Sequence, residues 1–533
     1  MFTTRVRTAV VTGLLILIAS ACAGNQESLR REAAKQLASG EGEFAAAAAL
    51  PDSAGGAEVV APAADAPEAT ASVPVASGPA QAGVSAAGPA PAAPVAGQPA
   101  RAQASASAGR SATASGPAAA PATGGAIATG PAQSASAAPT AANPAGAAAL
   151  APAGGNGGAT DVGVTADKVS VGAVFFHESY LDRYSRVSEH AIRAYFNEVN
   201  KQGGIYGRKI DYVGCIDGGD ASRSRACFKD LVENKKVFML GPTFSWSTGT
   251  IQEYVKAQKI PFVGSFGLYL EEYQADNRYS LPSQVPVFEI ARLFGKFLIE
   301  DVKPQTVGIS YLNIQAAQEC MNGLEDYLNK AGVKVVAKVS NEFDEPDLTS
   351  QVLKMRSANP DIVAFCNDPV NNAKFVGIAA RSQRYKPPMG WIGGWPTVPE
   401  FGKIVGDWGI GHYGFSSVCY HESPQCDADP DVRLFKQQMN AYYPGEMDRM
   451  HYYGQNLWCG AKMIVEALKQ AGPNLTREAF LNAIDSGTFF GWKCQGMEMF
   501  YKTGVRDGSK GGQMHQLDEK GRWQMVRNTY RAD

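Results

Sequence analysis

The stretch VSVGAVFF, Val169 to Phe176, decides the fold because it is an apolar run of strand length at the start of the part of the chain that is rich in aromatic residues. Behind it, Ser188 to Gln202 has apolar residues at helical spacing and ends at a Gly-Gly pair. Lys209 to Cys215 is the next expected strand, and Ser222 to Asn234 is the next helix. Regular alternation of strands and helices predicts a parallel sheet that is covered by helices on both faces.

The alternation continues through two series of elements. The first series closes with strands at Val237 to Leu240 and Ile260 to Val263, and a helix starts near Ser247 between them. The second series runs from a helix at Val287 to Glu300 to a strand at Met389 to Ile392, which predicts a second doubly wound sheet. A folded part of about 370 residues exceeds what one core usually supports, so two lobes are expected.

Three later helices are expected to pack on the first lobe, near Val432 to Tyr442, Gln455 to Gln470 and Arg477 to Asp485. The chain would then cross between the lobes more than once, which makes a hinge. The predicted fold is therefore α/β, with two doubly wound parallel-sheet lobes joined by a multi-crossover hinge. The first lobe takes residues 161–282 and 415–490, and the second takes residues 283–414 and 491–533.

Residues 22–160 are expected to form a flexible tether. From Ala45 to Gly158 the sequence is almost entirely Ala, Pro, Gly, Ser and Thr, so it has too few large apolar side chains to form a core. Before the tether, residues 1–21 combine basic Arg5 and Arg7 with an apolar run that is too short to span a bilayer. This combination is typical of an export signal.

Small residues directly precede Cys22, as in a bacterial lipobox, whose cysteine receives a diacylglycerol and becomes the mature N-terminus. We therefore expect a lipid on Cys22 that anchors the protein to the outer face of the cell membrane. The alternative is an ordinary secretory signal cut at an Ala-x-Ala site, with Cys22 incidental.

The cysteine count fits an oxidising compartment. Nine cysteines minus Cys22 leave an even number in the folded part, which can form disulfides. Two pairs are close enough in sequence to be local loop clips, and two more remain by elimination: Cys215 with Cys227, Cys419 with Cys426, then Cys320 with Cys366 and Cys459 with Cys494. Buried free thiols are the alternative for the last four.

Composition and motifs argue against nucleic-acid binding and catalysis. The formal net charge of −2 leaves no basic field to hold a polyanion. Gly409 to Gly414 matches G-x-G-x-x-G but runs into a strand-like segment instead of a helix. His177-Glu178 and His421-Glu422 lack the second histidine of a zinc-protease helix. We expect no catalytic residue, no metal and no cofactor.

The chain resembles the type I periplasmic solute-binding proteins, the leucine/isoleucine/valine-binding class, over Asp161 to Val526. The resemblance is carried by VSVGAVFF, NEVNKQGGIYGRKI (197–210), VGCIDGGDASRSRACFKDLV (213–232), VFMLGPTFSWST (237–248), KIPFVGS (259–265) and NPDIVAFCNDPVNNAKFVGIAA (359–380). It implies two lobes joined by three crossovers, a small-molecule ligand held in the cleft, and an ABC permease that recognises the closed form. A ligand-sensing lipoprotein without a transport role and an extracytoplasmic hydrolase are the rival interpretations.

Candidate ligand contacts of the first lobe follow two strands. The resemblance implies carboxylate recognition at the turn that holds Ser245, Trp246, Ser247 and Thr248, where hydroxyl and N–H groups open a helix. Helix capping is the alternative role of these hydroxyls. The resemblance also implies contacts from Ser265 and Gly267 after the next strand. Bulky residues beside Gly267 depart from the small hydroxyl residues of many relatives.

Candidate contacts of the second lobe are Gln315, Asn367 and Asp368. The resemblance implies that Gln315 stands where relatives place an aromatic cover, and that Asn367 and Asp368 stand where amino-acid binders place a partner for the ligand ammonium. Because Asp368 precedes a proline, capping of the next helix is the stronger interpretation. Tyr180, Trp246 and Trp395 are expected as aromatic walls, with a place in the core as the alternative. An amino acid, an amide or an aromatic or aliphatic carboxylate would suit such a site.

Overall fold

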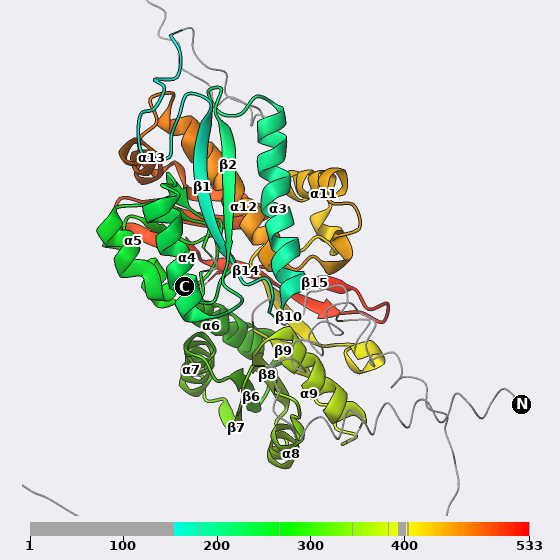
Figure 1. Ribbon diagram of the computed structural model, residues 1–533. Coiled ribbons are helices and arrows are strands. Elements are labelled where there is room, and N and C mark those ends of the chain that lie inside the picture. The colour runs from blue at the N-terminus through cyan, green and yellow to red at the C-terminus, as the bar shows by residue number, and fades with distance from the viewer. Residues whose placement is uncertain are drawn as a thin grey trace, which may run out of the picture. The chain divides into compact units, whose positions relative to one another are not determined.

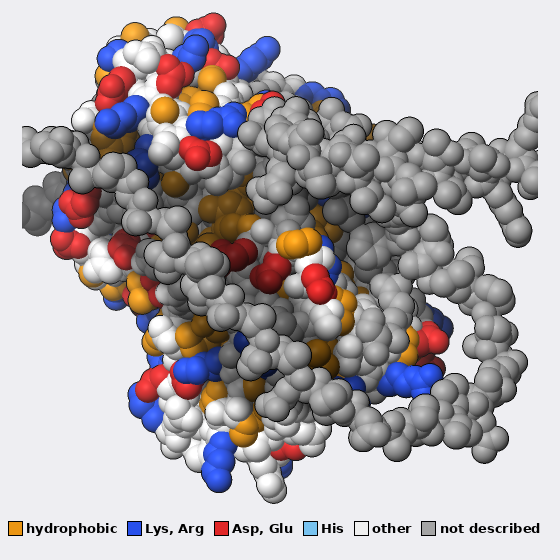
Figure 2. All heavy atoms as spheres, turned by 60° about the horizontal axis from the view of Figure 1, so that its bottom comes forward, with side chains coloured by type: hydrophobic (Ala, Val, Ile, Leu, Met, Phe, Trp, Pro, Cys, Tyr) orange, Lys and Arg blue, Asp and Glu red, His pale blue; other side chains and the backbone are white. Residues whose placement is uncertain are grey.

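The computed structural model describes residues 154–531, except residues 180, 266, 344, 382, 393–400 and 402–404; Figure 1 and Figure 2 draw the rest of the chain in grey. The predicted export signal, Cys22 and most of the predicted tether lie outside the described residues. No helix in the described part of the chain has the length and apolar character needed to cross a membrane.

The first lobe is built on a five-stranded parallel sheet with the order β2-β1-β3-β4-β5. Every residue of β1 except Lys168 is buried, as expected of a strand covered on both faces. The strands are β1 Lys168–Phe175, β2 Lys209–Ile216, β3 Met239–Leu240, β4 Phe262–Val263 and β5 Ser280–Leu281, and the helices between them are α3 Asp182–Lys201, α4 Ala221–Lys229 and α5 Gln252–Gln258.

The second lobe has a seven-stranded sheet with the order β15-β14-β10-β9-β8-β6-β7. Strands β6 to β10 pair in parallel, while β14 and β15 add to one edge in antiparallel fashion, which the sequence did not indicate. The strands are β6 Thr306–Leu312, β7 Lys334–Asn341, β8 Ile362–Cys366, β9 Met389–Trp391, β10 Tyr413–Ser416, β14 Gly511–Leu517 and β15 Trp523–Arg531; the helices are α6 Val287–Phe297, α7 Gln315–Lys330, α8 Thr349–Ala358 and α9 Pro369–Arg381. The predicted α/β class with two parallel sheets is confirmed.

The late helices α11 Pro430–Tyr442, α12 Tyr452–Ala471 and α13 Arg477–Ala483 pack on the first lobe. Trp458 of α12 meets Tyr195 of α3 edge to face, with ring centroids 4.9 Å apart, and Figure 1 shows the two helices near β1 and β2. Arg477 of α13 donates hydrogen bonds to the carbonyls of Val237 and Phe238. The chain therefore crosses between the two lobes after β5, after β10 and before β14. These crossings form a hinge of several segments.

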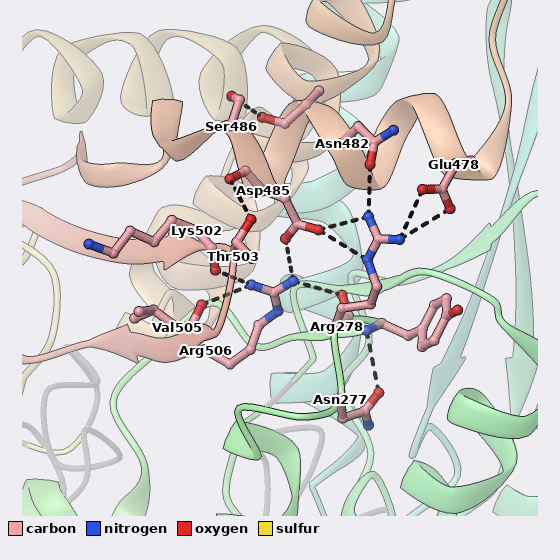
Figure 3. A network of polar contacts seen from close by, with 12 residues as sticks. Asn277, Arg278, Glu478, Asn482, Asp485, Ser486, Lys502, Thr503, Val505 and Arg506 are labelled. Carbon is pink, nitrogen blue, oxygen red and sulfur yellow. Dashed lines mark hydrogen bonds and ion pairs between the residues drawn. The ribbon is translucent and has the colours of Figure 1, made fainter. Parts of the chain in front are cut away.

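The segment 490–509 does not join the second-lobe sheet, contrary to the predicted boundary at residue 491. It forms a separate antiparallel sheet of β11 Phe490–Cys494, β12 Met497–Lys502 and β13 Val505–Ser509. Arg506, which is 1% exposed, pairs with Asp485, and Asp485 also pairs with Arg278 of the first lobe (Figure 3). The Arg278–Asp485 pair joins residues that are 207 positions apart, so local patterning could not reveal it.

The folded part also begins earlier than the predicted residue 161. The amide of Asn156 donates to the carbonyls of Ala166 and Tyr206, and Arg208 donates to the carbonyls of Asn156 and Gly158. Arg208 is 2% exposed, so its donors need partners. A Gly- and Asn-rich segment that supplies them with backbone carbonyls carries no hydrophobic signal.

Four disulfides join the pairs that the cysteine spacing suggested: Cys215 with Cys227, Cys320 with Cys366, Cys419 with Cys426, and Cys459 with Cys494. The first joins β2 to α4, and the second joins α7 to the end of β8. The second therefore lies at the carboxyl end of a parallel strand, where the ligand sites of such sheets form.

Candidate functional site: an apolar pocket between the lobes

A pocket with an empty volume of about 430 Å³ lies where residues of both lobes come together. Its walls are mainly aliphatic and aromatic, which is usual for small-molecule sites. The lining residues are Trp246, Leu268 and Tyr453 with the first lobe, and Val287, Leu312, Ile314, Ala316, Ala317, Cys320, Cys366, Asn367, Asp368 and Ile392 with the second. Of the predicted ligand contacts, Trp246, Asn367 and Asp368 line this pocket.

Trp246 forms the aromatic wall and connects the lobes. Its ring stacks on Phe176 of the first lobe, with ring centroids 5.4 Å apart and planes 10° apart. The ring of Phe343 from the second lobe also contacts Trp246, and the centroids of these two rings are 5.9 Å apart. Phe343 is 37% exposed, an unusual position for a large apolar ring. The Trp246–Phe343 contact exists only when the two lobes meet.

The second-lobe wall is formed by the end of β6 and the start of α7. Leu312 and Ile314 lead into Ala316 and Ala317, whose small side chains leave room for a ligand. The Cys320–Cys366 disulfide completes this wall, with both cysteines buried. A disulfide presents polarisable sulfur without a strong hydrogen-bonding group, so this wall is apolar.

Asp368 is the N-cap of α9. One carboxylate oxygen accepts hydrogen bonds from the backbone N–H groups of Val370 and Asn371 at 2.8 and 2.9 Å, and the other accepts from the Asn371 side chain at 2.8 Å. The capping role that the sequence favoured is thus present in the structure. Its neighbour Asn367 is held by Asn341, since each amide nitrogen donates to the other's amide oxygen.

Three hydroxyl groups of the predicted first-lobe contacts donate to buried carboxylates. Ser245 donates to Asp217 at 2.6 Å, and Thr248 donates to Glu272 at 2.9 Å. Ser265 donates to the second oxygen of Glu272 at 2.5 Å. Both carboxylates are buried and require donors, which explains the direction of these hydroxyls. Ser245, Ser247, Thr248, Ser265 and Gly267 do not line the pocket described above.

The helix expected to start near Ser247 begins a few residues later. A 3-10 turn at Gly249–Ile251 precedes α5, which has seven residues.

Glu272 is the central acceptor beneath the turn. It is fully buried, and this burial raises its pKa to about 7, although hydrogen bonds from Ser265, Thr248 and the backbone of Tyr269 and Leu268 act in the opposite direction. The sequence held no signal that this glutamate, rather than its neighbour Glu271, would face the interior.

Gln315 connects the lobes through hydrogen bonds. Its amide donates to Glu319 on its own helix at 2.8 Å and to Glu271 of the first lobe at 3.2 Å. Burial and then the nearby Glu271 charge raise the pKa of Glu319, which the Gln315 amide partly offsets. Two acidic side chains therefore stand beside the pocket wall of α7.

Tyr180 and Trp395, the other predicted aromatic walls, lie outside the described residues. Tyr453, Leu268, Phe343 and the Cys320–Cys366 disulfide are parts of the site that the sequence did not indicate. Tyr453 comes from a helix far along the chain, and Phe343 follows the exposed edge strand β7, so neither has a local signal of its position.

Two α/β lobes with a pocket at the facing strand ends define a two-lobed solute-binding protein. Residues 168–517 match the family model described as periplasmic binding protein, and the chain belongs to this family. Its fold is that of the type I class, to which leucine-, isoleucine- and valine-binding proteins belong.

Solved structures share this fold. A fatty acid ABC transporter substrate-binding protein from Thermomonospora curvata is 21% identical, with 72% of this chain and 97% of that chain covered and a TM-score of 0.59. A solute-binding protein of an ABC transporter from R. palustris in complex with benzoate is 14% identical, with 69% and 98% covered and a TM-score of 0.56. Both are binding proteins.

Among curated proteins, the leucine-specific-binding protein of Salmonella typhimurium is 20% identical over 207 residues. The match covers 39% of this chain and 56% of that protein. The chain thus spans little more than half the length of this relative.

Proposed function

We propose that the protein is an extracytoplasmic solute-binding lipoprotein that captures a small molecule between its lobes and delivers it to an ABC permease. The observation that carries this proposal is the apolar pocket to which both lobes contribute walls. Relatives of similar fold are described as substrate-binding components of ABC transporters for a fatty acid or branched-chain amino acids.

Ligand capture would act through lobe closure. The Trp246–Phe343 contact and the Gln315–Glu271 hydrogen bond join the lobes directly. A ligand that touches Trp246 on one side and Ala316 on the other has more contacts in the closed form than in the open form. Only such a difference in binding free energy can shift the equilibrium toward closure.

A thermal-shift titration of the full chain tests the binding function. Isoleucine, benzoate, octanoate and octanol sample the solute chemistries of the relatives and of the pocket. A ligand at roughly 100 times its dissociation constant stabilises the folded state by about 2.7 kcal/mol. The filled-pocket variant Ala316→Leu is expected to lose this stabilisation. If no solute raised the melting temperature of the wild type, the binding function would be wrong.

Export and anchoring form the second part of the proposal, with residues 1–21 as signal, Cys22 as lipid site and residues 22–160 as tether. One acyl chain holds a protein on a membrane only weakly, whereas two or more chains, as in a diacylglycerol, hold it stably. Metabolic labelling with a fatty acid should therefore mark the wild type, and Cys22→Ser should abolish the label and release the protein from membranes. An unlabelled wild type would contradict the lipid site.

A further inference from the structure

Recognition of an anionic solute requires donors or a cation at the pocket wall, because an unpaired carboxylate is costly to bury. Among the described lining residues there is no Lys, Arg or His. Arg183, a cation in the first lobe, lies with its guanidinium carbon 5.4 Å from the ring centre of Tyr184 and does not line the pocket. A carboxylate would find no positive partner among the described lining residues.

Three hydroxyl donors near Trp246 are engaged within the protein. The hydroxyl hydrogens of Ser245 and Thr248 go to Asp217 and Glu272, and that of Ser265 goes to Glu272. Each hydroxyl has a single hydrogen to donate. To bind a carboxylate they would have to leave a buried acidic group with fewer partners, which costs about 1 to 3 kcal/mol for each group.

Three acidic residues lie in or beside the described lining of the pocket. Asp368 is the charged residue among the described lining residues, and it is 2% exposed. Glu271 and Glu319 meet at Gln315, the residue that precedes the lining residue Ala316. On the face drawn in Figure 2, hydrophobic side chains likewise lie in a recess with acidic side chains beside it. These carboxylates would repel an anionic head group.

The described carboxylates near the pocket are also poor hydrogen-bond acceptors for a ligand ammonium group. The oxygens of Asp368 accept three N–H donors at the start of α9, and the carboxylate faces the positive end of that helix. Glu271 and Glu319 share the amide of Gln315 outside the described lining of the pocket. A buried cation would then lack a carboxylate with its full acceptor capacity.

We propose that the preferred ligand is an uncharged, mainly apolar molecule, aliphatic or aromatic, whose body lies between Trp246 and the Ala316–Ala317 wall. This proposal rests on the solute-binding function proposed above and narrows its ligand class. It separates this chain from relatives named for amino acids, fatty acids or benzoate, all of which carry a carboxylate.

Compounds that share a hydrocarbon body and differ in the head group and its charge test the ligand class. Octanol, octanoate and octylamine form one set, and benzyl alcohol, benzoate and benzylamine form the other, each measured by calorimetric titration of the full chain. In at least one set the neutral compound should bind at least about tenfold more tightly than both charged partners. A charged compound that binds equally or more tightly in both sets would overturn the proposal and leave the binding function intact.

Failure of all six compounds would also overturn the ligand class. Isoleucine, measured on the same preparation, then separates the two proposals. Binding of isoleucine would keep the solute-binding function, whereas its failure as well would count against both.

Two variants of pocket residues test whether the preference for a neutral ligand over a charged one arises at this pocket. Ile314→Lys places a cation in the wall and should shift the octanol-to-octanoate affinity ratio toward octanoate by about tenfold or more. Asp368→Asn keeps a good capping residue, removes one negative charge, and should shift the same ratio in the same direction by a smaller factor. Melting curves show that each variant is folded.

Asp326→Asn is the matched control, because Asp326 is on α7 and pairs with Lys330 at the exposed surface. This control should leave the ratio unchanged. If both folded pocket variants left the ratio as it is in the wild type, the pocket would not be the origin of the preference, and the proposal would be overturned.

Discussion

The two walls of the pocket use their polar groups in different ways. On the first lobe, the hydroxyls of Ser245, Thr248 and Ser265 point into the protein toward two buried carboxylates. On the second lobe, Asp368 caps a helix and Asn367 pairs with Asn341, while the rest of the described wall is aliphatic carbon and a disulfide. The comparison teaches that a hydroxyl-rich turn becomes an anion site only when no internal acceptor takes its hydrogens.

Removal of the Cys320–Cys366 disulfide should have the largest effect, and it acts on the second-lobe wall. The bond closes a loop of 46 residues, so the double variant to alanine should lose about 4 kcal/mol of unfolding free energy. Ligand affinity should fall as well, because both sulfurs line the pocket. Denaturant unfolding and calorimetry measure the two losses.

The Cys419–Cys426 pair is the control, because it closes a loop of seven residues away from the described lining of the pocket. Its removal should cost about 2 kcal/mol and leave affinity unchanged. Equal losses of affinity in the two double variants would show that the disulfide wall has no special role.

The variant Glu272→Gln tests whether the raised pKa of Glu272, behind the first-lobe wall, makes the stability of the protein depend on pH. The folded-state pKa of Glu272 is about 7, above its ordinary value of 4.5, so the folded protein holds this proton more tightly than the unfolded chain. The resulting stability is present below about pH 4.5 and is lost as pH rises through 7. Because glutamine does not ionise, the variant does not lose this unfolding free energy as the pH rises.

The variant should therefore gain about 3 kcal/mol relative to the wild type between roughly pH 4.5 and 8, measured by urea unfolding at several pH values. Glu253→Gln, at an exposed position on α5, is the control. A constant difference between Glu272→Gln and the wild type would mean that Glu272 does not carry the raised pKa.

The variant Ser245→Ala tests whether the Ser245 hydroxyl contributes to the unfolding free energy of the protein or to its affinity for ligand. Removal of the hydroxyl leaves buried Asp217 with one donor fewer, so the variant should lose about 1 to 2 kcal/mol of unfolding free energy. Because the hydroxyl faces Asp217 and not the pocket, ligand affinity should stay within about twofold of the wild type. A large loss of affinity with little change in stability would restore the anion cradle.

Phe343→Ala should have the smallest effect. It removes the ring that meets Trp246 across the lobes, and such aromatic contacts contribute about 0.5 to 1.5 kcal/mol. The loss should appear as weaker ligand binding by a factor of several, since the contact favours the closed form. Leu353→Ala, which truncates another exposed apolar residue of the second lobe, is the control and should not change affinity.

Much of the fold could be predicted from local pattern. The apolar run of β1, the helix that follows it and the later alternation correspond to observed elements, usually within a few residues at each end. The strands β11 to β13 and the pair β14 and β15 were not predicted, although they form hairpins between neighbours in the chain. The pairing of β14 with β10 joins distant segments, which local pattern cannot reveal. The ion pair of Asp485 with Arg278 likewise joins distant segments of the chain.

The sequence by itself determined the α/β class, the pairs of cysteines close enough to join, and the cap at Asp368, since each depends on hydrophobic periodicity or on residues near one another in the chain. Only the tertiary structure decided which way the hydroxyls of Ser245 and Ser265 point and which residues face the pocket. Those choices depend on where Asp217, Glu272 and Phe343 come to lie, and a buried carboxylate claims whichever donor the fold brings to it.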